Sequence, residues 1–308
     1  MPTLFLPGLE TLAHAEAPHL PALELLLARA RVRAGDSCWA MLAAQAGGDL
    51  GRWPVAPVSA LADFGRVPGP CLRVEPLGMD AEQRGAFRLR APALDLDLAE
   101  AQALAAAFNA AFGADGVRLE VATPVRWYLW HESADTPWRG FEEPPLLLDP
   151  ARRPAPAEPA LRRLLSEAEM LFFAHPVNAA RRDSGLPLVA GLHPWGGGRL
   201  DLPAQAATGT TVMSGDGEPY LHGLRRLGAL PSQAMAGGKQ VSWPAAPETL
   251  ATEGMAAIDR AVIAPLLARL RRSPGARLRL ATGRAVHELR GMDLLRIWQR
   301  PRHWAEAC

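Results

Sequence analysis

Apolar residues recur every three or four positions in several parts of the chain, which is the spacing that places them on one face of an α-helix. The clearest cases are the alanine-rich segment 98–112 and the segment 160–175. Residues 248–272 show the same spacing, and Pro265 is expected to kink that helix. Shorter helices are expected in the segments 21–32, 38–46 and 222–227.

Short apolar runs bounded by glycine and proline predict β-strands. The first run, Thr3 to Leu6, stops at the turn signal Pro7-Gly8. Because such runs alternate with the helical segments, the pattern predicts a parallel or mixed sheet that is covered on both faces. The further expected strands are residues 86–90, 117–121, 126–130, 188–192, 210–213, 277–281 and 294–298.

The density of proline and glycine divides the chain into parts. Residues 52–76 are rich in both and are expected to form a connector. The order strand, helix, strand, strand that follows predicts a small α/β unit of roughly a hundred residues. Residues 144–159 contain six prolines, so this segment is neither a continuous helix nor a central strand and is expected to be a linker.

Charge and composition exclude several classes of function. The 33 basic and 32 acidic residues give a net charge of +1, which offers no concentrated basic face for nucleic acid. No run of about 18 apolar residues is present, so we expect no transmembrane helix and no membrane partner, and the first residues lack the basic start of a secretory signal. Cys38, Cys71 and Cys308 are too scattered for a disulfide framework or a metal site. The expected location is therefore the reducing cytoplasm.

The densest group of candidate functional residues starts where the helix 160–175 ends. A histidine and an asparagine beyond a helix, followed by arginines and a glycine run, can cradle a phosphate or a carboxylate. The alternative is structural: His175 and Asn178 cap the helix, and the glycines form a tight turn. The residue types favour this alternative, and the glycine run has neither the dinucleotide-binding nor the P-loop spacing. The candidate ligand-binding residues are His175, Asn178, Arg181, Gly196, Gly197 and Gly198.

Other catalytic patterns are absent or have a simpler structural interpretation. The sequence has no His-x-x-x-His metal pair and no Gly-x-Ser-x-Gly nucleophile elbow. Cys38 or Cys71 would be a nucleophile only beside a histidine, and both are expected to be buried apolar side chains. The aromatic segment 126–130 can stack on a base or a sugar, but packing in the core is the commoner role of such a patch.

One stretch of the sequence resembles a known family. It reads His175-Pro176-Val177-Asn178-x-x-Arg181-x-x-x-Gly185-x-Pro187 and is followed by Trp195-Gly196-Gly197-Gly198. It is similar to the RpfE-type regulatory proteins of bacteria, which in turn resemble the archaeal-type, cofactor-independent phosphoglycerate mutases of the alkaline phosphatase superfamily. The resemblance implies a doubly wound, mostly parallel α/β sheet with a smaller α/β domain inserted near its start. It places the core in residues 1–65 and 160–308 and the inserted domain, with its proline-rich linker, in residues 66–159.

Departures from the family pattern fall at the positions of the metal site. Enzymes of this superfamily transfer phosphate through a phosphorylated serine beside two divalent metals. Pro7-Gly8 stands where an Asp-Gly is expected after the first strand, and Thr282-Gly283-Arg284 stands where an Asp-His is expected. Asp36-Ser37 is the nearest match to a Ser-Asp nucleophile loop, in reversed order. The resemblance therefore implies a scaffold with no catalytic residues, no metal ligands and no cofactor.

We therefore expect a regulatory or binding protein on a phosphoglycerate mutase-like scaffold that has lost metal-dependent phosphotransfer. Its partner is an unidentified protein or a small anionic ligand, positioned by the residues of the 175–198 cluster. The alternative is a cofactor-independent phosphoglycerate mutase or phosphatase with rearranged ligands, and that enzyme would need manganese or zinc. A structural scaffold without a small ligand is the third possibility.

Overall fold

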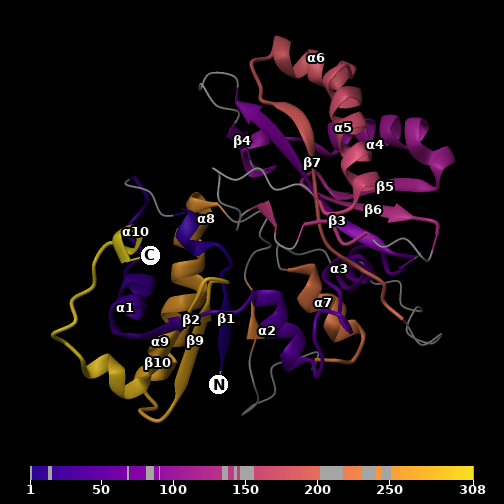
Figure 1. Ribbon diagram of the computed structural model, residues 1–308. Coiled ribbons are helices and arrows are strands. Elements are labelled where there is room, and N and C mark those ends of the chain that lie inside the picture. The colour runs from indigo at the N-terminus through magenta and orange to yellow at the C-terminus, as the bar shows by residue number, and fades with distance from the viewer. Residues whose placement is uncertain are drawn as a thin grey trace. The chain divides into compact units, whose positions relative to one another are not determined.

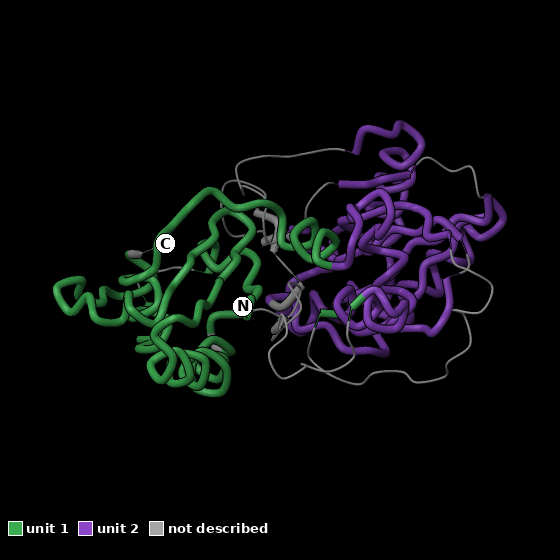
Figure 2. Tube along the Cα trace, turned by 90° about the horizontal axis from the view of Figure 1, so that it is seen from below, with its two compact units in different colours: residues 1–45, 216–218, 230–308 green, residues 46–215, 219–229 purple. Residues whose placement is uncertain are grey.

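The chain folds into two compact units in the computed structural model (Figure 2). The first unit comprises residues 1–45, 216–218 and 230–308, and the second unit comprises residues 46–215 and 219–229. The structure describes residues 2–12, 16–67, 69–80, 87–89, 91–133, 138–141, 144–145, 156–201, 218–230, 241–243 and 251–307.

The first unit is built on a five-stranded mixed sheet with the order β2-β10-β9-β1-β8 (Figure 1). The central strand β1 runs parallel to both β8 and β9, whereas β10 is antiparallel to β9 and to β2. The predicted doubly wound, mostly parallel sheet is not confirmed, because β10 runs against both of its neighbours and separates β2 from the parallel strands. The strands are β1 Thr3–Phe5, β2 Arg31–Ala34, β8 Val241–Ser242, β9 Arg277–Ala281 and β10 Ala285–Arg290.

Helices α1 and α9 of the first unit contact each other and strands of its sheet. Asp259 begins a π-helical turn that ends at Ile263 and joins α8 to α9, and its carboxylate accepts the N–H groups of Ala22 and Leu23 at 3.2 and 2.7 Å. It thereby satisfies donors that the start of α1 leaves unpaired. The sequence predicts a kink at Pro265. The irregular π-helical turn ends at Ile263, two residues earlier, and Pro265 lies in the first turn of α9, where the loss of a backbone N–H costs little. The helices are α1 Pro21–Arg29, α2 Cys38–Gln45, α8 Thr252–Ile258, α9 Ala264–Arg271 and α10 Trp304–Ala307.

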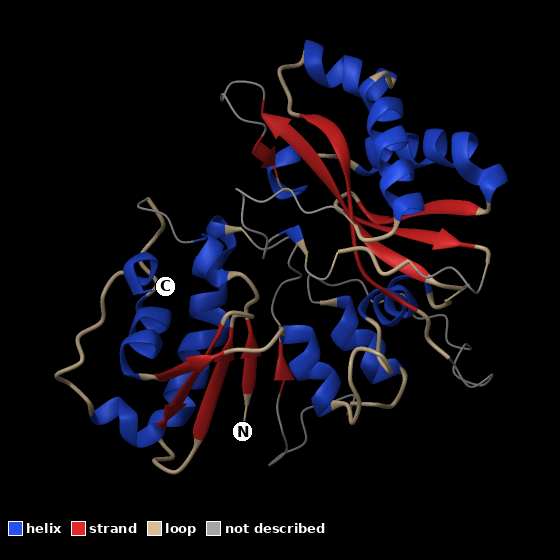
Figure 3. Cartoon of the chain, viewed as in Figure 1, coloured by secondary structure: helices blue, strands red, loops and turns tan. Residues whose placement is uncertain are grey.

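The second unit contains an antiparallel sheet in which β3 is central. Strands β4 and β6 pair with one edge of β3, β7 pairs with its other edge, and β5 continues the sheet beyond β6. Figure 3 shows these strands together with the helices of the same unit. The strands are β3 Cys71–Asp80, β4 Phe87–Leu89, β5 Val117–Thr123, β6 Arg126–His131 and β7 Leu188–Gly198, and the helices are α3 Val55–Phe64, α4 Leu98–Phe112, α5 Pro159–Phe173, α6 Pro176–Asp183 and α7 Pro219–Arg226.

The predicted connector 52–76 is wrong, because it holds α3 and the first half of β3. Two of its prolines stand at positions that a helix tolerates: Pro54 precedes α3, and Pro57 lies in the first turn, where the N–H groups have no partner within the helix. Pro76, in contrast, lies within β3, opposite Leu192 of β7.

Strand β7 is longer than predicted and includes the glycine run 196–198. It pairs with β3 from Met79↔Leu188 to Cys71↔Gly198, and these ladder hydrogen bonds bring α5, α6 and β7 into the second unit. The compact units thus have different boundaries from the predicted domains, which placed residues 160–215 with the core.

The two faces of the second sheet differ in character. One face is apolar and packs under α4 and α5 in a core that includes Leu72, Val74 and Trp127. The opposite face carries Cys71, Tyr128 and charged side chains, and α3 covers part of it. We call this second surface the polar face.

Several predicted elements are confirmed and others are not. The helix 98–112 is found with the same bounds, between the capping box of Asp97 and Glu100 and Gly113. The expected strand 294–298 is wrong. Its first two residues belong to a 3₁₀ helix, Gly291–Leu295, and β10 is the last strand among the described residues. The expected strand 210–213 and most of the linker 144–159 lie outside the described residues. Within the described ranges, no helix is both long and apolar enough to span a bilayer.

We predict that Gly223→Ala destabilises the second unit. A Cβ atom at residue 223 of α7 would lie 1.9 Å from the carbonyl oxygen of Val58 in α3, so the two helices must move apart. Overpacking of this kind costs about 1–3 kcal/mol. Gly254→Ala is the control, because a Cβ atom there meets nothing within 4 Å. Urea unfolding should show a lower free energy of unfolding than the wild type for Gly223→Ala but not for Gly254→Ala. Equal stability of the two variants would contradict the close approach of α7 to α3 at Gly223.

Candidate functional site

The loops that follow β1 and β9 meet at one edge of the first sheet. Leu6 N–H donates to the Ala281 carbonyl at 2.9 Å, and Gly8 N–H donates to the Thr282 carbonyl at 2.8 Å. Because β1 and β9 are parallel, both loops leave the carboxyl ends of their strands. Ligands of open α/β sheets bind at such an edge, so we take this carboxyl edge as the first candidate site.

Glu10 and Thr282 are the polar side chains that meet at the carboxyl edge. The Thr282 hydroxyl donates to Glu10 Oε1 and accepts the N–H of Ala285 at 3.1 Å. Thr282 is fully buried, and Glu10 Oε2 is buried with no hydrogen bond from the described residues. The Thr282 hydroxyl is therefore held in place by the fold, and Glu10 Oε2 remains able to accept a hydrogen bond or to bind a cation.

Cys38 is the first residue of α2, and its thiol lies 3.6 Å from the Ala281 carbonyl at the same edge. Burial raises the pKa of this thiol well above its usual range, and the negative charges of Glu10 and Glu218 raise it further. The side chain is therefore a protonated thiol at neutral pH and not an activated nucleophile. Burial likewise raises the pKa of Cys71 in the second unit, and the expectation that both cysteines are buried is confirmed.

The sequence-predicted residue His175 lies in the second unit, where it is the N-cap of α6. Its Nδ1 accepts the N–H of Val177 at 3.2 Å, and Pro176 occupies the first position of the helix. The structural alternative for this histidine is thus observed, although the helix that it caps is α6 and not the preceding α5.

Asn178 is fully buried and joins three elements of the second unit. Its amide nitrogen donates to the carbonyls of Phe172 in α5 and Val189 in β7, at 2.7 and 2.8 Å. Its carbonyl oxygen accepts the N–H of Val189 at 2.9 Å. Each hydrogen of the amide group and its oxygen is therefore used within the fold.

Arg181 is also buried, and its guanidinium group is surrounded by acceptors. It donates to the Pro187 carbonyl at 2.8 Å, to Glu100 of α4 at 2.6 Å and to the carbonyl of Leu94. These contacts hold α6 against the start of α4. The side chain acts here as a connector between segments of the second unit.

The three glycines form the last residues of β7 and not a tight turn. Gly196 has a φ of +64°, which favours glycine, and a Cβ atom at Gly197 would lie 2.4 Å from Leu72. The N–H groups of Gly196 and Gly197 donate to the carbonyls of Phe141 and Arg139. These glycines thus allow the segment 138–141 to approach the strand.

The structure does not bring the six predicted ligand-binding residues together. Asn178 contacts β7 at Val189, whereas Gly197 lies eight residues farther along the same strand, and a strand rises about 3.3 Å per residue. The α6 residues and the glycines are therefore roughly 25 Å apart along β7. Ligand binding by either group stays a prediction, but one pocket formed by both is excluded.

The polar face of the second sheet holds functional candidates that the sequence analysis did not single out. Asp63 of α3 forms a two-pronged ion pair with Arg126, at 2.8 and 3.0 Å, and accepts the Tyr128 hydroxyl at 2.6 Å. Burial and the adjacent Asp63 raise the pKa of Tyr128 well above its usual range. Arg73 and Glu75 of β3 share this face and are fully buried.

Cross-strand pairing aligns these charges. Glu75 lies opposite His193 of β7, and Arg73 lies opposite Trp195, with its guanidinium 5.0 Å from the centre of the indole ring. Charged residues at alternate positions of Cys71-Leu72-Arg73-Val74-Glu75 are the signal in the sequence. Such alternation usually marks a solvent-facing strand, and here it marks a buried polar face.

His222 and Arg225 of α7 belong to the surroundings of this face. Burial lowers the pKa of His222, and the positive charge of Arg225 lowers it further, so the neutral imidazole is favoured. Burial also lowers the pKa of Arg225, whose Nε is buried without a hydrogen bond from the described residues. Arg225 is therefore the positive charge with an unused donor that α7 brings to this face.

Comparisons with known proteins give weak structural similarity. No protein-family model matches the chain, and no curated protein matches it. A cofactor-independent phosphoglycerate mutase from Thermoplasma acidophilum is 19% identical, with a TM-score of 0.39 over 93% of this chain and 88% of that one. The PH0037 protein from Pyrococcus horikoshii is 12% identical, with a TM-score of 0.43 over 93% of this chain and 86% of that one. At these values the likeness carries no conclusion about activity.

We predict that Asn178→Ala lowers the free energy of unfolding by about 2–4 kcal/mol, since three buried hydrogen bonds are each worth about 1 kcal/mol. Asn109→Ala is the matched control, because Asn109 makes only two hydrogen bonds, both to Leu119, in a partly buried position. Denaturant unfolding should show about half the loss for Asn109→Ala. Equal losses would mean that Asn178 is not the link between α5, α6 and β7.

We predict that Cys38 and Cys71 resist alkylation in the folded protein. Their raised pKa values leave almost no thiolate at pH 8, and both are buried. Mass spectrometry after iodoacetamide treatment of a Cys308→Ser variant should find neither residue modified, and both modified in denaturant. Rapid native labelling of Cys38 would show instead that the carboxyl edge activates this thiol.

Proposed function

We propose that the chain is a regulatory or binding protein on a phosphoglycerate mutase-like scaffold that lacks metal-dependent phosphotransfer. The observation that supports this most is the composition of the carboxyl edge. Leu6 and Pro7, which follow β1, offer no side-chain ligand atom, and the loop after β9 offers Thr282, whose hydroxyl is engaged by Glu10 and Ala285.

A two-metal phosphotransfer site needs several carboxylates and histidines around the reacting oxygens. Among the described residues, the one group of three potential metal-binding side chains lies elsewhere in the first unit, at His19, Glu24 and His303. Without two metals, the charge that develops on a transferring phosphoryl group would have no counterion. The described carboxyl edge therefore suits a non-catalytic role.

The polar face of the second unit supports binding of a small anion. Arg73, Arg126 and Arg225 bring three positive charges to its surroundings, against the negative charges of Asp63 and Glu75. Arginine forms planar, two-pronged contacts with phosphate and carboxylate groups. We assign the small-anion site to Arg225, where a buried N–H group lacks an acceptor among the described residues.

The second candidate is the enzyme, a cofactor-independent phosphoglycerate mutase or phosphatase with rearranged ligands. It is favoured by Glu10, whose buried Oε2 accepts no hydrogen bond, and by the nearby charge of Glu218. These two carboxylates could hold one manganese or zinc ion at the carboxyl edge. A bound metal there would supply Lewis-acid chemistry to a phosphate oxygen.

The test combines turnover, metal content and ligand binding. We expect no interconversion of 3- and 2-phosphoglycerate with added Mn²⁺ or Zn²⁺, and no change in bound metal in Glu10→Gln. We also expect 3-phosphoglycerate to raise the Tm of the wild type and of the control Arg163→Gln, which changes an exposed residue of α5, but not of Arg225→Gln. Turnover that disappears in Glu10→Gln would establish the enzyme instead, and an unchanged Tm in the wild type would exclude the small-anion site.

A further inference from the structure

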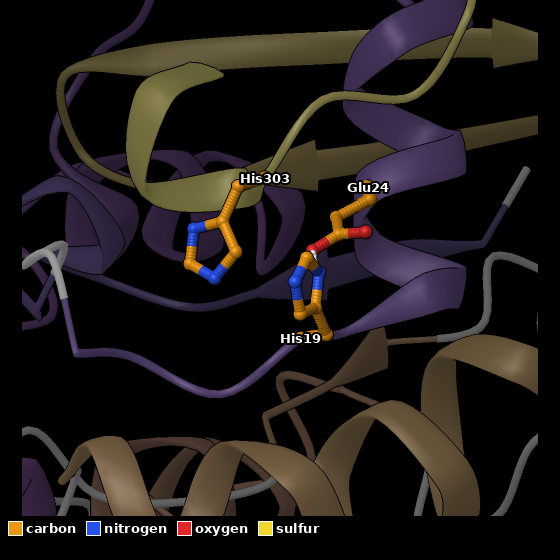
Figure 4. Close-up of side chains that lie close together, drawn as sticks. All are labelled: His19, Glu24 and His303. Carbon is orange, nitrogen blue, oxygen red and sulfur yellow. Dashed lines mark hydrogen bonds and ion pairs between the residues drawn. The ribbon is translucent and has the colours of Figure 1, made fainter.

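Three side chains that can bind a metal converge in the first unit from the two ends of the chain (Figure 4). They are His19 and Glu24, around the start of α1, and His303, just before α10. One donor atom from each lies within 4.8 Å of the others, and the His19 and His303 rings meet edge to face at 4.6 Å between centres.

Two hydrogen bonds already hold the segments that carry His19 and His303 together. The indole N–H of Trp304, a fully buried residue, donates to the Pro18 carbonyl at 2.8 Å. The His303 ring nitrogen Nε2 lies 2.9 Å from the Ala17 carbonyl, one residue farther back. The backbones that carry His19 and His303 are therefore positioned by packing, which reduces the entropy that a ligand would have to overcome.

Glu24 and His19 are preorganised by the first turn of α1. Glu24 Oε1 accepts the N–H of Leu20 at 3.2 Å and lies 3.1 Å from His19 Nδ1. The Glu24 side chain is only 10% exposed, whereas that of His19 is 76% exposed. The buried carboxylate of Glu24 thus lies beside the exposed imidazole of His19.

We propose that His19, Glu24 and His303 form a binding site for a divalent transition metal of the zinc class. Two imidazole nitrogens with one carboxylate oxygen form a ligand set that zinc uses with a fourth, open position. Calcium and magnesium prefer sites made of oxygen atoms, so this set selects against them.

The distances suit such a site after a small adjustment. Zinc–nitrogen bonds of about 2.0–2.1 Å place tetrahedral donors roughly 3.3 Å apart, and the 3.1 Å between His19 and Glu24 is close to this value. The three donor atoms lie within 4.8 Å of one another, so no separation has to shrink by more than about 1.5 Å, which rotation of the exposed His19 ring can provide.

His303 has one hydrogen bond at each ring nitrogen, and coordination replaces one of them. Nε2 lies against the Ala17 carbonyl at 2.9 Å, and Nδ1 accepts the N–H of Ala305 at 3.3 Å. The hydrogen bond that remains fixes the orientation of the ring, as partners of metal-bound histidines commonly do.

One of the three side chains, His19, also lines a pocket of the first unit. The pocket has a volume of about 500 Å³, and Arg260 and Arg271 line it as well. Water or a small anion can therefore complete the coordination of the metal. The metal would also tie the C-terminal segment to α1, a cross-link that is independent of the carboxyl edge and of the polar face.

The experiment is a titration of tag-free protein with Zn²⁺ and Co²⁺, followed by calorimetry and by the visible absorption of four-coordinate Co²⁺. The wild type should bind one ion, and zinc should raise its Tm. Affinity should fall at least tenfold, equivalent to about 1.4 kcal/mol, in each of His19→Ala, Glu24→Gln and His303→Gln. His19→Ala changes an exposed side chain, so its loss of affinity cannot be attributed to misfolding. His131→Ala in the second unit is the control and should bind zinc like the wild type.

Two results would overturn this site. One is equal zinc affinity in the wild type and in both His19→Ala and His303→Gln. The other is zinc that is lost in Glu10→Gln but kept in His303→Gln, since that ion would occupy the carboxyl edge. The second result would also count against the proposed non-catalytic function, whereas the first would leave that function unaffected.

Discussion

The second unit depends on the pairing of β3 with β7. Strand β7 pairs with β3 along one edge, β6 and β4 pair with the two ends of its other edge, and helices cover the two faces of the sheet. The pairing draws α5 and α6 into this unit and places Glu75 opposite His193. Burial of the polar face follows from this arrangement, because a central strand covered by α3 cannot turn its charged side chains to bulk water. Those charges must therefore pair with one another or with a ligand.

Elements whose signals are local could be predicted from the sequence, and α4 is the clearest example. Its apolar spacing, its capping box and the glycine that follows all lie within 17 residues, from Asp97 to Gly113. The segment 52–76 was misjudged because prolines at the start of a helix and prolines in a connector look alike in sequence. The antiparallel direction of β7 could not be predicted, since a strand's partner is chosen by contacts distant in sequence.

The candidate site residues likewise divide into those that local sequence identifies and those that depend on contacts distant in sequence. The motif from His175 to Pro187 stabilises the fold through hydrogen bonds. His175 caps α6, Asn178 links α5 to β7, and Arg181 donates to the carbonyl of Pro187. A sequence pattern that looks like a ligand cradle can thus be maintained by the hydrogen bonds of a turn between elements. Arg73 and Glu75 were missed for the opposite reason, because their burial depends on the neighbouring strand and helix and not on their own sequence context.

Unused donor and acceptor atoms point to chemistry more directly than sequence motifs do in this protein. Asn178 and Arg181 have their polar groups engaged within the fold, whereas Glu10 Oε2 and Arg225 Nε are among the buried polar atoms that lack a hydrogen bond from the described residues. Desolvating such a group costs about 1–3 kcal/mol unless something binds it. An ion or a charged ligand that binds Glu10 or Arg225 would recover this cost, and the two histidines and the carboxylate of the first unit offer a third position. These three positions, and not the 175–198 motif, are therefore where we expect an ion or a charged ligand to bind.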